Sequence, residues 1–380
     1  MSSRDFQRTM PGASTHFQRA PGWWSYTHLD AWLLLLLLVL CSFGLFVLYS
    51  ASSQDMEYVQ RQAIRMAAGF ALLIFLAQIQ PRSFMLMAPW LYLLGVGLLV
   101  AVMLFGVSAK GAQRWIALPG FRFQPSELMK LVLPMAMAAF LVRDHLPPTL
   151  KRLVVAVIIM AIPAALIMKQ PDLGTSLLIA SSGIFVILLS GIYWRYVLVA
   201  LGLMGAVLPV FWGFMKPYQQ QRVLTFLNPE SDPLGSGWNI IQSKTAIGSG
   251  GLSGKGWLEG TQSQLNFLPE SHTDFIIAVI GEELGLYGIA LLILLYLLII
   301  ARGMVIAARA NDSFSRLLAG GVTLTFFVYV TVNIGMVSGL LPVVGVPLPM
   351  ISYGGTSIVT LMAGFGILMS VSAHSGVQRH

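Results

Sequence analysis

The sequence predicts an all-α polytopic membrane protein. Of its 380 residues, 56% are hydrophobic and only 10% are charged, and the mean hydropathy is +0.77. So little charge cannot cover the surface of a soluble domain of this size. In addition, apolar runs of about 20 residues, long enough to cross roughly 30 Å of hydrocarbon as a helix, recur along nearly the whole chain.

Ten such runs are expected to form transmembrane helices. A helix satisfies its backbone polar groups within one segment, as lipid requires. Solid runs such as WLLLLLLVL also lack the short alternating segments that are typical of a β-barrel. The predicted spans are 31–50, 60–79, 84–106, 126–142, 153–168, 173–190, 196–215, 274–301, 317–339 and 353–373.

An even number of spans puts both termini on one side of the membrane. With both termini in the cytoplasm, more Lys and Arg residues lie on the inner side than in the short outer connections, as the positive-inside rule requires. The formal net charge of +8 is therefore attributed to topology and to anionic membrane lipids, and not to nucleic acid.

A single transmembrane domain is expected over residues 30–380, because most spans are joined by short connections. Residues 1–29 are polar, basic and interrupted by Pro and Gly, which predicts a loose cytoplasmic tail. The stretch 216–272 is long for a chain of tight connections and is predicted to be a functional extracytoplasmic loop. Short amphipathic helices are expected in it near 218–227 and 237–247.

One apolar stretch near the C-terminus is interrupted by prolines. Pro342, Pro347 and Pro349 fall within the run from Ile334 to Ser357. Irregular backbone at membrane depth is tolerated only where it lines a cavity or is buried in protein. This stretch is therefore predicted to point inward, toward a site.

Carboxylates at the start of the eighth span are unusual for an apolar segment. Asp274 stands at its outer end, where the positive end of a helix dipole favours negative charge, so helix capping and catalysis are both open interpretations. Glu282 and Glu283 lie about 12–14 Å deeper, which is too far for capping. Because an isolated ionised carboxylate is costly in lipid, we expect these glutamates to be neutral or paired and to support the site structurally.

A second polar group lies at the outer start of the fourth span. Glu127 and Lys130 are three residues apart and share a helix face. An ionisable pair at this depth is a candidate binding site, and a self-neutralising structural pair is the alternative. Lys110, Arg114 and Trp115 precede it, and such a basic cluster fits either a phosphate group or lipid headgroups.

Other polar residues have two interpretations each. Asp172, in the tight turn KQPDLGTS, either caps the next helix or borders an outward cavity. The Gly-rich stretch 248–257 lacks the spacing of a phosphate-binding P-loop, and His272 is expected to be interfacial. No spacing demands a metal, so a divalent cation, Mg²⁺ or Mn²⁺, is left open as the cofactor.

Several motifs occur in a fixed order along the chain. They are KGAQRWI, FQPSE with LMK, QPDLGTS, the long stretch from QQQRVLTFLNPE to SHTDFI, EELG and LPVVGVPLPMISYGGTS. Together they resemble the SEDS family (shape, elongation, division and sporulation), the polytopic bacterial cell-wall polymerases. The resemblance covers nearly all ten spans, and KGAQRW and FQPSE are more similar to the RodA type of elongation than to the FtsW type of division.

The resemblance implies a peptidoglycan glycosyltransferase that polymerises lipid II on the outer face of the bacterial inner membrane during cell elongation. The family's essential carboxylate falls on Asp274, and its acid–base pair falls on Glu127 and Lys130. In such a reaction a sugar 4-hydroxyl attacks an anomeric carbon and displaces a lipid pyrophosphate, so the site needs a base and nearby cations. Asp274 is the predicted general base, and the predicted substrate-binding residues are Arg114, Lys130, Arg222 and Lys244 for the pyrophosphate, with Lys110, Trp115, Ser126, Glu127, Asp172, Gln242, His272 and Ser352.

Two other functions stay open at this point. A lipid II flippase also places charged groups and broken helices around a cavity, although here the polar groups gather at the outer ends and not near the midplane. A non-catalytic anchor for a partner enzyme is the third candidate. The resemblance implies a class B penicillin-binding protein, which supplies transpeptidase activity, and other elongation-complex proteins as partners.

Overall fold

The structure is a computed structural model, and it describes residues 28–109, 112–118, 121–215, 220, 224, 236–264 and 271–374. Within this part of the chain, helices occur at all ten predicted spans, and seven of them are long and apolar enough to cross a membrane. The chain is therefore a multi-pass, helical membrane protein. The predicted tail lies outside the described residues apart from His28 and Leu29, as does most of the helix expected near 218–227.

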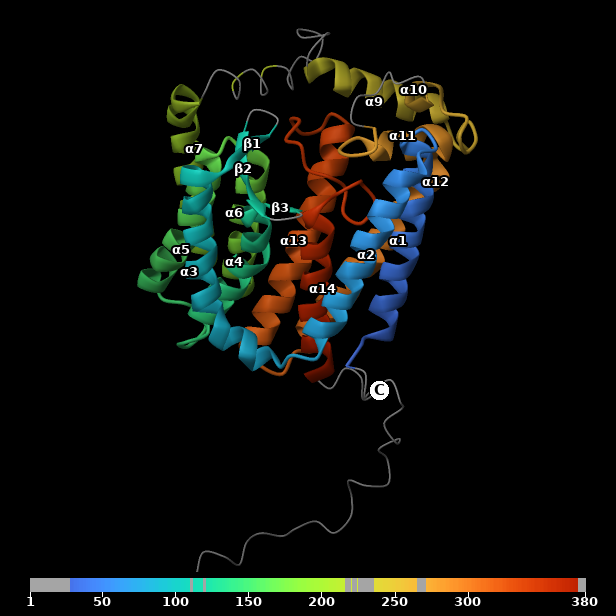
Figure 1. The fold of residues 1–380 in the computed structure, drawn as a ribbon. Helices are drawn as coiled ribbons and strands as arrows, with labels where there is room; N and C mark the ends of the chain where they lie inside the picture. Colours follow the sequence, from blue (N-terminus) through green and yellow to red (C-terminus); the bar gives the residue numbers. More distant parts are fainter. Residues whose placement is uncertain are drawn as a thin grey trace, which may run out of the picture.

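The long helices run roughly side by side in one bundle (Figure 1). Their bounds are α1 (Ala31–Ala51), α2 (Met56–Ala77), α3 (Pro81–Phe105), α4 (Pro125–Leu141), α5 (Leu150–Lys169), α6 (Leu173–Leu189), α7 (Trp194–Phe214), α12 (Gly285–Ala308), α13 (Ser313–Val337) and α14 (Thr356–His374). Helices α13 and α14 are the most buried of the long apolar helices. Helix α13 packs against α12, α6 and α4, whereas α14 packs mainly against α2.

Aspartates define the start of four bundle helices. Asp30, Asp55, Asp172 and Asp312 precede α1, α2, α6 and α13, and each side chain accepts a hydrogen bond from a backbone N–H of the first turn. Such caps satisfy donors that the helix itself leaves without a partner. The structure therefore confirms the interpretation of Asp172 as a cap.

The connections at one end of the bundle are more elaborate, and we call this the loop end. It carries α9 (Ser236–Gly250), α10 (Thr261–Gln264) and α11 (Ile276–Glu283), as well as three short strands (Figure 1). Helix α9 confirms the helix expected near 237–247. The strands β1 (Val107–Ala109), β2 (Ala112–Leu118) and β3 (Phe121–Phe123) form an antiparallel sheet in the order β1-β2-β3 that the sequence analysis did not predict.

The eighth predicted span, 274–301, is wrong as a single helix. It divides into α11 and α12 at Gly285, whose φ of +64° suits a glycine. The loop after α9 occupies the break: the N–H groups of Lys255 and Gly256 donate to the carbonyls of Glu282 and Glu283 at 3.0 and 3.1 Å. The backbone groups left open by the break therefore find partners in the loop.

Residues 338–355, between α13 and α14, form no helix, as the prolines predicted. This segment includes buried Val346, Leu348 and Met350 and returns into the bundle next to α2 and α13. Gln62 of α2 donates to the Ser352 carbonyl at 2.9 Å, which fixes the end of the segment against the bundle. Side-chain amides thus replace the helical hydrogen bonds that the prolines exclude.

The helix break yields a test of stability. A Cβ added at Gly285 would lie 2.3 Å from the backbone nitrogen of Gly254 and 2.6 Å from the carbonyl oxygen of Leu252, in a left-handed conformation. We expect Gly285→Ala to destabilise the protein by about 2 kcal/mol or more, because it adds a backbone clash to an unfavourable φ. The measurement is the thermal unfolding midpoint of the purified protein in detergent.

Gly97→Ala in α3 is the matched control, because nothing lies within 4 Å of a Cβ at this exposed helical position. Alanine favours a helix over glycine, so its midpoint should be unchanged or slightly raised. Equal midpoints for the two variants would contradict the role assigned to Gly285.

Candidate functional site

A cleft of about 400 Å³ opens at the loop end of the bundle. Its walls come from β2, α4, the turn between α5 and α6, the turn before α11, α13, and the irregular segment before α14. The lining residues that the sequence analysis selected are Arg114, Trp115, Glu127, Lys130, Asp172 and Asp274. The fold thus brings together six predicted residues that are up to 160 positions apart in the sequence.

Glu127 and Lys130 form a buried ion pair on one wall. The distance from Lys130 Nζ to Glu127 Oε1 is 2.6 Å, and the two residues are 6% and 7% exposed. Pro125 starts α4 and sets this helix turn, so that both side chains point into the cleft from one face. Lys130 Nζ also lies 4.9 Å from the centre of the Tyr329 ring, which adds a cation–π contact from α13.

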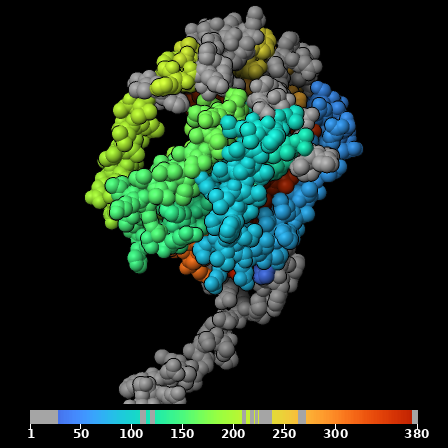
Figure 2. All heavy atoms as spheres, turned by 60° about the vertical axis from the view of Figure 1, so that its left-hand side comes forward, coloured from blue at the N-terminus to red at the C-terminus, as the bar shows by residue number. Residues whose placement is uncertain are grey.

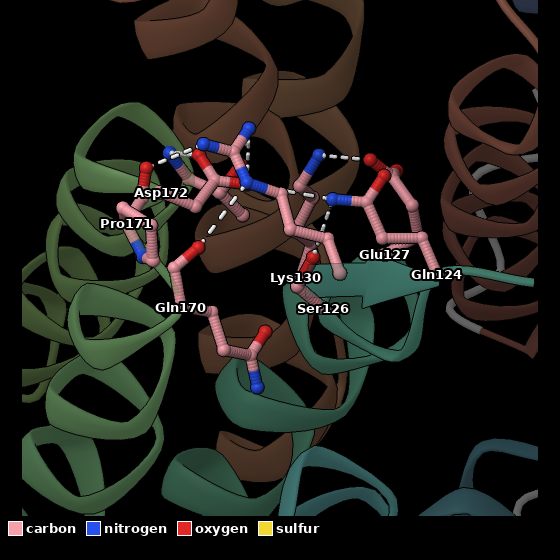
Figure 3. Close-up of polar contacts among 9 residues, drawn as sticks. Gln124, Ser126, Glu127, Lys130, Gln170, Pro171 and Asp172 are labelled. Atoms are coloured by element: carbon pink, nitrogen blue, oxygen red, sulfur yellow. Dashed lines mark hydrogen bonds and ion pairs between the residues drawn. The ribbon is translucent and has the colours of Figure 1, made fainter. Parts of the chain in front are cut away.

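Arg114 joins the strands to the turn between α5 and α6. Its guanidinium lies 3.5 Å from the Asp172 carboxylate and donates to the backbone carbonyls of Gln170 and Pro171. Gln124 donates to the same carboxylate at 3.4 Å and to Ser126 at 3.0 Å (Figure 3). Asp172 therefore caps α6 and also orients the cation of this wall, so its two predicted roles coexist.

Asp274 lines the cleft from the turn before α11. Helix α11 starts at Ile276 with Phe275 at the N-cap position, so the helix start at 273 or 274 on which the capping interpretation of Asp274 depended is wrong. The backbone carbonyl of Asp274 accepts a hydrogen bond from Asn333 Nδ2 at 2.9 Å. A Cβ at Gly345 would lie 3.5 Å from Asp274 Oδ2, so the glycine backbone passes directly beside the carboxylate.

Asn333 is a residue that the sequence analysis missed. It is 0% exposed, and its Nδ2 donates to the carbonyls of Asp274 and Val346 at 2.9 and 2.6 Å. One amide thereby joins the turn that carries Asp274 to the irregular segment that carries Gly345. A single Asn within an apolar span could have indicated this contact, because the side-chain amides of membrane helices usually form hydrogen bonds with another segment.

Among the residues that the structure describes, the remaining predicted binding residues do not line the cleft. Ser126 and Ser352 are buried, and the Ser352 hydroxyl donates to the Thr273 carbonyl and accepts from the Leu348 N–H at 2.8 Å. Gln242 and exposed Lys244 lie on α9, where a Cβ at Gly339 would meet Lys244 Nζ at 2.7 Å. His272 lies outside the lining, near Tyr58 and Tyr353, while Lys110 and Arg222 fall outside the described residues.

The two deep glutamates lie at the C-terminal end of α11, away from the cleft lining. Glu282 is 0% exposed and accepts from Lys255 Nζ at 2.7 Å and from the Gln262 N–H at 2.8 Å. Glu283 accepts from the Ser50 hydroxyl at 2.5 Å. Glu282 thus holds the loop between α9 and α11, and Glu283 holds α1, so both contacts fix the helix that follows Asp274.

The described residues contain no group of three or more His, Cys, Asp or Glu side chains that would hold a metal ion. In the cleft, Glu127 and Asp172 each already face a cation. A divalent cation in the cleft would therefore need ligands besides these side chains, such as the phosphates of a substrate. The divalent cation considered from the sequence stays a prediction.

The sequence model of the family described as cell cycle protein FtsW/RodA/SpoVE matches residues 31–376. The chain belongs to the FtsW/RodA/SpoVE family. The predicted membership of the SEDS family is thereby confirmed.

Curated members of this family are similar over nearly their full length. The chain is 55% identical over 352 residues to the peptidoglycan glycosyltransferase MrdB of Escherichia coli K12, covering 92% of this chain and 95% of the relative. It is 38% identical over 356 residues to the probable peptidoglycan glycosyltransferase FtsW of Trichlorobacter lovleyi, covering 90% and 93%.

Solved structures show the same fold. A chain from a study titled "Structural coordination of polymerization and crosslinking by a peptidoglycan synthase complex" aligns with a TM-score of 0.81 at 30% identity, over 91% of this chain and 98% of that one. The crystal structure of RodA from Thermus thermophilus aligns with a TM-score of 0.69 at 28% identity, over 90% and 96%.

The buried pair in α4 yields a second test. Lys130→Met leaves the Glu127 carboxylate buried without its ammonium partner, and we expect a loss of about 3–5 kcal/mol of stability. The double variant Glu127→Gln/Lys130→Met removes both charges and should recover much of that loss. Thermal unfolding of both variants in detergent measures the difference.

Asp144→Asn is the control, since it breaks the ion pair with Arg152 at a site where the Asp144 side chain is 63% exposed. A surface pair contributes about 0–1 kcal/mol, so its midpoint should stay close to that of the unmodified protein. If the double variant is no more stable than Lys130→Met alone, the two charges do not stabilise each other.

Proposed function

We propose that the cleft at the loop end extends glycan strands from lipid II, with Asp274 as the general base. The chain is a peptidoglycan glycosyltransferase of the elongation type, as its motifs predicted and as its 55% identity to MrdB supports. The observation that carries the mechanism is that the Asp274 carboxylate shares a single cleft with two cations, Arg114 and Lys130, which already face the carboxylates of Asp172 and Glu127.

The chemistry needs only a few groups. The 4-hydroxyl of the acceptor sugar attacks the anomeric carbon of the donor, and the bond from that carbon to the lipid diphosphate breaks. Asp274 takes the hydroxyl proton, while Arg114 and Lys130 stabilise the charge of the departing diphosphate. A strong acid is not required, because diphosphate leaves as a stable anion.

The surroundings of each group suit this division of roles. The amide of Asn333 and the backbone of Gly345 fix the turn that carries Asp274. Asp172 and Glu127 hold the cations in place before substrate arrives. Because these contacts exist in the free protein, little reorganisation is needed when charge develops on the leaving group.

The proposed setting is the bacterial inner membrane, with ten spans, both termini in the cytoplasm and the loop end outside. In this orientation the polyprenyl tails of the substrates stay in the bilayer, and their sugars enter the cleft from the outer surface. The distribution of Lys and Arg supports it, because the short connections at the opposite end are the more basic.

The proposed partners are lipid II, membrane lipids, a class B penicillin-binding protein and other proteins of the elongation complex. Support for the protein partner comes from the similar chain whose study title names a peptidoglycan synthase complex. A divalent cation, Mg²⁺ or Mn²⁺, remains a proposal that chelation during the polymerisation assay tests.

Asp274→Asn tests the proposed base. The amide cannot take the hydroxyl proton, so we expect polymerisation of purified lipid II to fall roughly 10²–10⁴-fold while the protein still folds. The products are separated on a gel, and the unfolding midpoint is measured on the same preparation. Detergent solution also separates polymerisation from flipping, since a flippase leaves the substrate chemically unchanged.

Glu259→Gln is the matched control, because it neutralises an exposed carboxylate of the loop end that does not line the cleft. Its activity should equal that of the unmodified protein. A folded Asp274→Asn variant with full activity would eliminate Asp274 as the base.

A further inference from the structure

A second group of charged and aromatic side chains lies beside the cleft, where His272 and Tyr353 meet side chains of α2. It consists of Tyr58, Arg61, Arg65, His272 and Tyr353, and we call it the α2 cluster. Its two arginines are not among the residues predicted from the sequence to bind substrate, and neither arginine lines the cleft. Tyr353 belongs to both places, because it lines the cleft and packs against α2.

The three rings form a compact aromatic surface. The ring centre of Tyr58 lies 5.3 Å from that of His272 and 5.0 Å from that of Tyr353, and the last two lie 6.1 Å apart. All three side chains are partly exposed. Partly exposed aromatic rings offer an apolar face together with polar atoms at the rim, which suits the mixed surface of a sugar.

Arg65 is unusual for a residue in a membrane-crossing helix. It lies about 13 Å along α2 from Met56 at 1.5 Å per residue. Its guanidinium lies 4.7 Å from the centre of the Tyr353 ring and 3.4 Å from the Gly354 carbonyl. No carboxylate of the described residues pairs with it, although arginines at such depth usually pair with an acid.

Arg61 lies one turn closer to the loop end and extends the positive charge. It pairs with Glu57, but both side chains are more than half exposed, so this ion pair is weak and easily replaced. Two guanidinium groups one helix turn apart are spaced to hold the two phosphates of a diphosphate.

The segment behind the cluster is held firmly. Gln62 donates to the Ser352 carbonyl at 2.9 Å, and the Gly354 N–H lies 3.4 Å from Gln62 Oε1. Helix α2 and residues 352–354 therefore form one wall at the rim of the cleft. Figure 2 shows the surface between α2 and α3, where α14 is visible from outside the bundle.

We infer that the α2 cluster binds the diphosphate of the acceptor lipid, which is a second lipid-diphosphate subsite. This inference rests on the proposed function, because a polymerase of this kind uses two lipid-linked diphosphates. The donor diphosphate departs from the reacting carbon, so it must lie beside Asp274 and the cleft cations Arg114 and Lys130. The acceptor diphosphate is two sugar rings away from the attacking hydroxyl, which matches cations at the rim and not in the cleft.

The aromatic rings lie between the arginines of the α2 cluster and the cleft. Tyr353 lies between Arg65 and the cleft, so the sugars of the acceptor would pass over it toward Asp274. Arg65 would exchange its weak contact with a carbonyl for a charge-assisted pair with phosphate. The lipid tail leaves the cluster along α2, which faces the bilayer.

The test separates acceptor from donor. Lipid II whose sugar 4-hydroxyl is blocked acts only as a donor. With this donor in excess and unblocked lipid II varied as the acceptor, the initial rate reports a single transfer that forms a tetrasaccharide. We expect Arg65→Gln to raise the KM for the acceptor about tenfold or more, as expected for a lost charge-assisted hydrogen bond. The KM for the blocked donor and the kcat at saturation should change little.

Two variants control this experiment. Arg65→Lys keeps a cation, so its KM for the acceptor should be close to that of the unmodified protein. If Arg65 had a purely structural role, keeping the charge would not have this effect. Arg316→Gln removes an exposed arginine at the opposite end of α13 and should leave both constants unchanged. The unfolding midpoint is measured for all variants, so that a folding defect is seen directly.

The outcomes are distinct. A rise in donor KM alone, or unchanged constants in a folded Arg65→Gln variant, would overturn the acceptor subsite and leave the proposed function intact. An unmodified protein that makes no tetrasaccharide would instead overturn the proposed function itself. A rise in acceptor KM that lysine reverses supports the subsite.

Discussion

The cost of holding charge away from water governs this structure. At the end opposite the loops, the carboxylate of Asp30 is 2% exposed, and it accepts from Arg302 at 2.6 and 3.1 Å and from Ser372 at 3.0 Å. One aspartate thereby joins α1, α12 and α14. A buried charge is tolerated only with such partners, so each one fixes how segments from distant parts of the chain meet.

The same rule shapes the loop end. Glu282 fixes the loop after α9, Glu283 fixes α1, and Asp172 and Glu127 hold the cleft cations. Apart from the Glu127–Lys130 pair within α4, these contacts join segments that are far apart in the sequence. Most of them lie near positions where a helix ends or breaks. At such positions, backbone N–H and C=O groups without a helical partner also need hydrogen bonds.

Close approach of backbones is the second constraint on the site. A Cβ at Gly250 would lie 1.9 Å from the Gly281 carbonyl oxygen, so the C-terminal end of α9 reaches α11 only because the side chain is absent. Gly345 passes beside Asp274 with a φ of +71°, a backbone conformation that favours glycine. The Asn333 amide joins the Asp274 turn to Val346 at 2.9 and 2.6 Å. A turn held in this way suits the proposed base, which must meet a substrate hydroxyl in one geometry.

The sequence by itself determined the helical membrane architecture, the family and six of the residues that line the cleft. The length and hydropathy of a segment decide whether it enters lipid. Motifs such as FQPSE can be recognised from the sequence alone and indicate the family. Only the tertiary structure decided the break at Gly285, the small sheet, and the contacts of Asn333 and Arg65, because each depends on a partner from another segment. Local sequence records how a segment prefers to fold, whereas the partner of a buried polar group is set by packing in three dimensions.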